Sequence, residues 1–357
     1  MRLFRVARLA GPLCLAVILI AGCGGSDEKS NAFEDRPAPP ASSFPATQGR
    51  SLAQVLEQEA SSNTTLVLTP TQRVFYTGQN RFGFGVFTRS AREQVGDAEV
   101  ALYAAKAPPP GALPKPSAGG DPATKKGQTG RLELALGGRA LGPYPAKAIT
   151  LETEAAFTAK TTADDPDSGK IVYTADIDFP SDGEWRIAAL IKDGDQLAGT
   201  ILPSAVVGQF TSIPRVGELP PPINTPTRDS VSDPSELTTR IPPETMNDVD
   251  FAEALGKMPI VLLFATPQFC ESRVCGPVVD VAAQVQRDYD DQVEFIHMEI
   301  YNDNDPAKGV RPQVRDFNLP SEPWLFVIDR NGQISSEIEG AFGVGELTEA
   351  VRGVAGS

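Results

Sequence analysis

Short runs in which apolar and polar residues alternate dominate the chain between residues 63 and 211. The clearest run is 171–179, where every second residue is apolar, which predicts a β-strand with one buried face. Turn signals follow this run, with Pro-Ser-Asp-Gly at 180–183 and Asp-Gly at 193–194. Several short strands separated by such turns predict an antiparallel β-sandwich over 63–211.

Strand and helix patterns alternate between residues 248 and 357 instead. The run 259–264 is continuously apolar, as expected of a strand that is buried on both faces. Pro277 suits the first turn of a helix, and apolar residues then recur at helical spacing as far as Val285. The remaining patterns predict, in order, a strand at 293–300, a helix at 311–317, strands at 324–328 and 333–338, and a helix at 345–354. This order predicts an α/β domain over 248–357.

Two segments have the composition of linkers. Residues 23–62 are rich in Ser, Gly, Pro and acidic residues, which predicts a flexible tether. Within it, 51–59 has the pattern of a short helix capped by Ser51. Residues 212–247 are rich in proline and form either a semi-rigid linker or the lead-in of the C-terminal domain.

Composition limits the classes of partner. The chain has 357 residues, of which 41% are hydrophobic, so it can form the packed cores of two domains. Its formal net charge of −14 disfavours nucleic acid and anionic membrane surfaces as electrostatic partners. We therefore expect no binding of nucleic acid.

The N-terminus has the pattern of an export signal. Three arginines precede an apolar run, 9–20, that is too short to span a bilayer comfortably. The run ends in Leu-Ile-Ala-Gly-Cys at 19–23, which resembles the lipobox of bacterial lipoproteins. The resemblance implies that 1–22 is a signal peptide and that Cys23 carries lipid. The chain would then be anchored by that lipid to the extracytoplasmic face of the cell membrane. An ordinary secretory signal with a chance cysteine is the alternative.

The cysteine count then directs attention to one pair. Of the four cysteines, Cys14 would leave with the signal peptide and Cys23 would carry lipid, so Cys270 and Cys275 remain. An oxidising compartment allows them to form a disulfide. His297 is the single histidine, which excludes a histidine-rich metal site. We expect no cofactor and no metal ion.

Four motifs stand out in the last 110 or so residues: Phe269-Cys270, Cys275-Gly276-Pro277, Glu322-Pro323-Trp324 and Asp329-Arg330-Asn331-Gly332. Together with the order of elements, they resemble the thioredoxin fold, and thus the thioredoxin and peroxiredoxin superfamily. The resemblance implies thiol–disulfide exchange with the thiols and disulfides of exported proteins. It implies that Cys270 and Cys275 are the catalytic pair and that Pro323 is a cis-proline facing them. The sandwich resembles immunoglobulin-like extracellular domains in architecture only, because it has no signature cysteine or tyrosine corner.

The pair departs from the family pattern in its spacing, which is C-x4-C rather than C-x2-C. Residues five apart on a regular helix lie about 140° apart around its axis and cannot form a disulfide. We therefore predict that the helix starts near Gly276, with both cysteines in the loop before it. Cys270 is favoured as the attacking residue. Alternatively, Cys275 is the attacking residue, and it belongs to a CGPC motif whose last cysteine is replaced by Val278. The buried acid that thioredoxins carry on the first core strand has no counterpart in 259–269.

Other functions remain open for the pair. One alternative is a structural disulfide in a non-catalytic binding or scaffold lipoprotein, although a short loop gains the least stability from such a bond. A peroxiredoxin-like peroxidase is disfavoured because Leu263 and Pro267 stand where the peroxidatic motif requires proline and threonine or serine. A copper-handling protein would need His297 as a ligand. Arg273, beside the cysteine pair, either stabilises a thiolate or is solvated.

Overall fold

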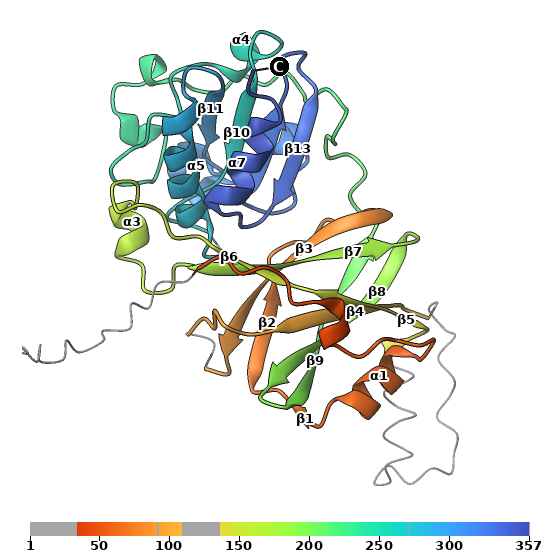
Figure 1. The fold of residues 1–357 in the computed structure, drawn as a ribbon. Coiled ribbons are helices and arrows are strands. Elements are labelled where there is room, and N and C mark those ends of the chain that lie inside the picture. Colours follow the sequence, from red (N-terminus) through yellow and green to blue (C-terminus); the bar gives the residue numbers. More distant parts are fainter. Residues whose placement is uncertain (1–33, 91–92, 109–135, 271, 357) are drawn as a thin grey trace, which may run out of the picture. The chain divides into compact units, whose positions relative to one another are not determined.

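A computed structural model of the chain describes residues 34–90, 93–108, 136–270 and 272–356. The expected signal peptide, 1–22, and the expected lipidation residue, Cys23, lie outside these described residues. Phe33–Ser357 form one compact unit that is rich in antiparallel β-sheet and contains a few helices (Figure 1). Among the helices in the described ranges, none is both long and apolar enough to cross a membrane.

Two sheets form the N-terminal β half of this unit and share one hydrophobic core. Their strand orders are β1-β9-β8-β4-β5 and β2-β3-β7-β6, and every pairing in them is antiparallel except that of β1 with β9. The strands are β1 (Ser62–Asn63), β2 (Leu66–Pro70), β3 (Gly78–Thr88), β4 (Val100–Lys106), β5 (Ala140–Pro145), β6 (Lys147–Thr150), β7 (Ile171–Phe179), β8 (Gly183–Asp193) and β9 (Gln196–Val207). A short helix, α3 (Lys160–Ala163), lies between β6 and β7.

The predicted strand and its turns are confirmed. The apolar residues that alternate along β7 are all buried in the shared core, while Asp176 and Asp178 are exposed. The turn at 180–182 connects β7 to β8, and the turn at 194–195 connects β8 to β9. Gly194 has a positive φ of 60°, which glycine adopts without steric cost.

Part of the segment that we expected to be a flexible tether is packed, so that expectation is wrong for it. Helix α1 (Leu52–Glu59) begins after Ser51, whose hydroxyl accepts a hydrogen bond from the backbone N–H of Gln54 at 3.2 Å. Leu52, Ala53 and Val55 are fully buried in a cluster with the outer face of the five-stranded sheet. This apolar helix face covers a sheet face that water would otherwise contact.

A mixed sheet with strand order β11-β10-β12-β13 forms the C-terminal half. Its elements follow the predicted order: α4 (Phe251–Ala254), β10 (Ile260–Phe264), α5 (Cys275–Tyr289), β11 (Glu294–Met298), α6 (Pro312–Asp316), β12 (Trp324–Ile328), β13 (Ile334–Glu339) and α7 (Val344–Arg352). All five residues of β10 are buried, since α5 and α7 cover one face of the sheet and α4 and α6 cover the other. The short 3-10 turns are η1 (Ala41–Ser43), η2 (Arg228–Ser230), η3 (Pro234–Glu236), η4 (Asn302–Asn304) and η5 (Pro306–Lys308).

The proline-rich segment 212–247 packs against the C-terminal half. Ile213 and Ile223 belong to the core on the α4 and α6 side of the sheet, and Met246 belongs to the core on the other side. The charged side chains of Arg240 and Glu244 in the same segment are also buried. Of the two interpretations of this segment, the packing favours the lead-in of a domain over a free spacer.

The outer face of the β2-β3-β7-β6 sheet contacts the C-terminal half directly. Ile149 and Val172 from this sheet lie in one core cluster with α5 and α7. Arg81 on β3 forms an ion pair with Glu346 on α7, with 2.8 Å between nitrogen and oxygen. The carboxylate of Glu339 on β13 accepts two backbone N–H groups from residues 73 and 74, at 2.9 and 2.8 Å. Core packing and ion pairing therefore both join the two halves.

Candidate functional site

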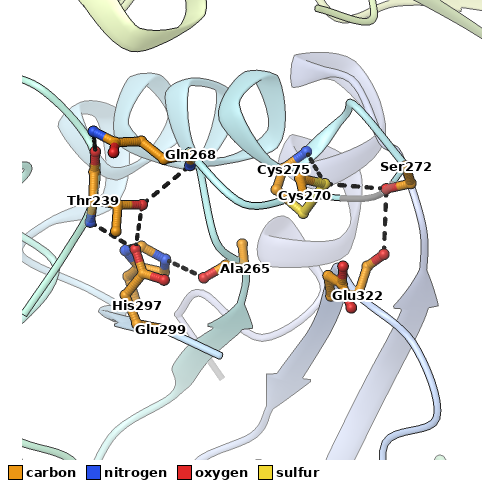
Figure 2. The surroundings of a disulfide bond; sticks show 9 residues. All are labelled: Thr239, Ala265, Gln268, Cys270, Ser272, Cys275, His297, Glu299 and Glu322. Atoms are coloured by element: carbon orange, nitrogen blue, oxygen red, sulfur yellow. Dashed lines mark hydrogen bonds between the residues drawn. A yellow bond between two sulfur atoms is a disulfide. The ribbon is translucent and has the colours of Figure 1, made fainter. Parts of the chain in front are cut away.

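The two cysteines lie at the end of the loop between β10 and α5, called here the cysteine loop (residues 265–275). They form a disulfide with a Cα–Cα distance of 5.8 Å, which is an ordinary separation (Figure 2). Cys275 is the first residue of α5, so the helix begins one residue earlier than predicted and only Cys270 precedes it. Cys275 is fully buried, whereas Cys270 is half-buried. Of the two cysteines, Cys270 is therefore the one that is partly open to solvent.

Two hydrogen-bond groups surround the Cys270 sulfur. The backbone N–H of Cys275 points at Sγ of Cys270 from 3.2 Å, and the hydroxyl of Ser272 also lies 3.2 Å from it (Figure 2). The N–H belongs to the first turn of α5, whose aligned peptide dipoles favour negative charge at this end. Both groups can donate a hydrogen bond to the Cys270 sulfur, whether it is bonded to Cys275 or reduced.

Ser272 also connects the cysteines to Pro323. Its hydroxyl donates to the backbone carbonyl of Glu322 at 3.3 Å, and the peptide bond between Glu322 and Pro323 is cis. Ser272 thus links Cys270 to the cis peptide bond that precedes Pro323. A serine hydroxyl has one proton, so Ser272 donates either to the carbonyl or to the sulfur at a given moment.

A buried charged pair holds the first residue of the cysteine loop. The Nδ1 atom of His297 on β11 lies 2.7 Å from a carboxylate oxygen of Glu244, and its Nε2 atom lies 3.1 Å from the carbonyl oxygen of Ala265. A carbonyl only accepts, so Nε2 must carry a proton and donate. With a carboxylate at the other nitrogen, the imidazolium and carboxylate form an ion pair that is almost inaccessible to water.

The pKa values of this pair shift as its geometry requires. Burial alone lowers the pKa of His297, but the charge and hydrogen bond of Glu244, the charge of Glu299 and the hydrogen bond to Ala265 together outweigh it, so the pKa is raised. Burial alone raises the pKa of Glu244, but the charge and hydrogen bond of His297, together with hydrogen bonds from a backbone group and from Thr238, outweigh it, so the pKa is lowered. Each partner thus keeps the other charged.

A second group of hydrogen bonds holds the middle of the loop. The hydroxyl of Thr239 accepts the backbone N–H of Gln268 at 3.1 Å (Figure 2). The backbone carbonyl of Thr239 accepts the side-chain amide of Gln268 at 2.8 Å. In turn, the backbone N–H and hydroxyl of Thr239 donate to the carboxylate of Glu299, at 2.6 and 2.7 Å. Residues of the segment 238–247 therefore hold the cysteine loop in place through hydrogen bonds.

The N-terminal part of α5 is held by another buried ion pair. Arg240 donates to one carboxylate oxygen of Asp280 at 2.8 Å, and the backbone N–H of Ala159 donates to the other at 3.0 Å. Burial raises the pKa of Asp280 in spite of these hydrogen bonds and the charge of Arg240. Asp280 and Glu244 are thus buried acids near the cysteine loop, although neither lies on the first core strand.

The sequence indicated the cysteines and Pro323 but missed Ser272, Glu244, Thr239 and Gln268. The one signal available was the lone histidine within an apolar strand, because such a residue needs polar partners once it is buried. Both ring nitrogens of His297 have partners, so the copper-handling interpretation has no support from its geometry. In the part of the chain that the structure describes, no group of three or more His, Cys, Asp and Glu side chains is arranged to hold a metal ion.

Comparison with known proteins identifies no relative: no protein-family model matches the chain, and no curated protein matches it.

Proposed function

We propose that this protein is a membrane-anchored, extracytoplasmic thiol–disulfide exchange protein that acts through Cys270 and Cys275. The observation that carries the proposal is the environment of the Cys270 sulfur. Cys270 is partly exposed, and its sulfur accepts the first N–H of α5 and contacts the hydroxyl of Ser272. That hydroxyl also lies within hydrogen-bond distance of the Glu322 carbonyl, which precedes a cis-proline. Cys275 is buried at bonding distance, as a resolving cysteine should be.

The exchange proceeds in two balanced steps. In the reduced protein, the Cys270 thiolate attacks one sulfur of a target disulfide, and the other target sulfur leaves as a thiolate. The Cys275 thiolate then attacks the Cys270 sulfur, and the first target sulfur leaves. The protein ends with a Cys270–Cys275 disulfide, the target ends with two thiols, and two electrons have passed to the target. The reverse sequence oxidises a target dithiol.

The fold assignments belong to the same proposal. The order β10-α5-β11-α6-β12-β13-α7, with a mixed sheet and a cis-proline before β12, supports a thioredoxin-like domain. The two sheets that share one core support an immunoglobulin-like β-sandwich in the N-terminal half. The lipobox at 19–23 supports anchoring through lipid on Cys23.

One alternative function is favoured by a specific observation. Cys275 is fully buried and lies within the core cluster beneath α5 and α7, which also suits a structural disulfide in a binding or scaffold lipoprotein. The partial exposure of Cys270 favours exchange, because a bond that serves only stability gains nothing from an accessible sulfur.

The reduction potential of the Cys270–Cys275 bond tests the proposal. We expect a value between about −120 and −270 mV, the range of known exchange proteins, measured by equilibration in redox buffers with thiol trapping. Structural bonds typically lie below about −300 mV. A bond that stays oxidised in these buffers until the protein is unfolded would contradict exchange and support the structural alternative.

Ser272→Ala is expected to slow the attack of Cys270 on a small disulfide about tenfold at neutral pH. The substitution removes a hydroxyl that can donate to the thiolate, and a hydrogen bond to a charged group contributes about 1.5–3 kcal/mol. The loss should shrink at alkaline pH, where the thiolate forms without this donor. Stopped-flow rates across the pH range check this, and Ser272→Thr, which keeps the hydroxyl, should react nearly as fast as the unchanged protein. A rate loss that is equal at every pH would indicate that Ser272 has only a structural role.

A further inference from the structure

A cavity of about 280 Å³ lies between the cysteine loop and the outer face of β2 and β3. Two cross-strand pairs line it, Val67 with Phe87 and Thr69 with Gly85, so these four residues share one face of the sheet. A Cβ atom at residue 85 would meet the Phe87 ring at 2.5 Å, so the glycine lets this ring lie across the floor of the cavity. Residues 272–274 of the cysteine loop form part of the wall.

Ser272 belongs both to this cavity and to the redox site. It lines the cavity, and its hydroxyl lies 3.2 Å from the Cys270 sulfur (Figure 2). Ser272 therefore connects the cavity wall to the Cys270 sulfur. In a mixed disulfide, the target is covalently joined to Cys270, so its residues next to the bonded cysteine must lie on the surface around this sulfur.

The cavity has the chemistry of a site for extended polypeptide. Its floor is apolar at Val67 and Phe87, and Val67 is 40% exposed. Its lining includes the ion pair of Arg273 and Asp167, whose side chains are about half exposed at a separation of 3.5 Å. The volume is close to the lower limit of small-ligand pockets, so it holds one or two apolar side chains rather than a folded partner. β2 is an edge strand of its sheet, and edge strands commonly receive extended segments.

Close contacts hold the cavity wall in place. The backbone N–H of Gly169 in the β half donates to the carbonyl of Arg273 at 2.8 Å. A Cβ atom at residue 169 would meet a methyl carbon of Val274 at 2.8 Å, so the two backbones can approach this closely only with a glycine there. The β half and the cysteine loop therefore form one preorganised surface.

We propose that this cavity binds the apolar residues flanking the reactive cysteine of an extended polypeptide substrate, so that the β half selects the substrate. The inference rests on the proposed exchange function and assigns a substrate class to the same site. The Cys270 thiolate attacks the peptide sulfur of a peptide disulfide, the Cys270–peptide bond forms, and the former partner sulfur leaves with the electron pair as a thiolate. Apolar flanking residues in the cavity hold the peptide sulfur in line during this attack.

The test uses the full chain with Cys14, Cys23 and Cys275 replaced by serine, which leaves Cys270 as its single thiol. The probe is a ten-residue peptide with a central cysteine, flanked by leucine and valine and joined by a disulfide to thionitrobenzoate. The comparison probe is free cysteine joined to thionitrobenzoate. Release of coloured thionitrobenzoate gives both second-order rate constants. We expect the peptide to react at least tenfold faster than free cysteine.

Val67→Glu is expected to reduce this tenfold preference to near unity, because it places a carboxylate on the apolar floor. Thr69→Glu, at a second exposed lining position, is expected to act in the same direction. The matched control is Val206→Glu. Val206 is a valine on β9 in the other sheet, and its exposure of 39% is close to the 40% of Val67. This control should keep the preference for the peptide.

Equal rates for the two probes, or a preference that survives both Val67→Glu and Thr69→Glu, would overturn the cavity proposal while leaving exchange intact. If Cys270 reacts with neither probe, the exchange function itself fails, and the cavity proposal fails with it.

Discussion

Cys270→Ser is expected to reduce disulfide exchange to the background rate, whereas Cys275→Ser is expected to stop it after the first step. A serine hydroxyl is not ionised at neutral pH and does not attack a disulfide, so the first variant has no accessible nucleophile. The second variant keeps the partly exposed Cys270 but has no thiol that can resolve the mixed disulfide. Target proteins should therefore remain covalently attached to Cys275→Ser and be visible as reducible bands on non-reducing gels.

The two cysteine variants control for one another. Both lose the same disulfide, and in the chain-entropy model a bond between residues five apart contributes about 2 kcal/mol. A difference in trapping between them is therefore not caused by loss of the bond itself. The structure predicts trapping by Cys275→Ser alone because the Cys275 sulfur is inaccessible. Trapping by Cys270→Ser alone would show that Cys275 attacks first, as in the alternative alignment to CGPC. Trapping by neither would support a structural disulfide.

Local patterns predicted the elements of this fold well. The period-two run of β7 and the continuous apolar run of β10 have the burial that those patterns predict, because side-chain direction in a strand follows from backbone geometry. The start of α5 at Cys275 was predicted to within one residue, since Pro277 suits only the first turn of a helix. These features depend on neighbours in sequence.

Packing between distant segments was not predictable in the same way. The apolar side of α1 indicates that it packs, but nothing in its pattern says that its partner is the outer face of the five-stranded sheet. Proline content made 212–247 resemble a spacer, yet Ile213 and Ile223 pack in the core and Thr239 holds Gln268 of the cysteine loop. The partners of His297 lie 53 residues away, at Glu244, and 32 residues away, at Ala265. Sequence reasoning found the residues with distinctive chemistry and missed the ordinary residues that position them.

His297→Leu is expected to lower the free energy of unfolding by about 3–5 kcal/mol, because it leaves the Glu244 carboxylate buried without its charged partner. Glu244→Leu is expected to have an effect of similar size. The double variant removes both charges, so its cost should be about 2 kcal/mol or more below the sum of the single costs. Unfolding in guanidinium chloride with the disulfide intact measures all three values.

The pH dependence of stability gives this ion pair a second signature. The pKa of His297 is raised, so its contribution is complete below the ordinary value of 6.5 and is lost as the pH rises through the raised value. The pKa of Glu244 is lowered, so its contribution is complete above the ordinary value of 4.5 and is lost as the pH falls through the lowered value. The double variant should lack both contributions.

An exposed ion pair of almost the same length provides the control. Arg287 and Glu154 lie 2.8 Å apart, against 2.7 Å for His297 and Glu244, but their side chains are 44% and 56% exposed. Glu154→Leu should change stability little, since water and salt already screen this pair. If His297→Leu were equally harmless, or if the costs of the two single variants simply added, the buried charges would not be coupled. The cysteine loop would then be held at Gln268 by Thr239 and not at Ala265 by His297.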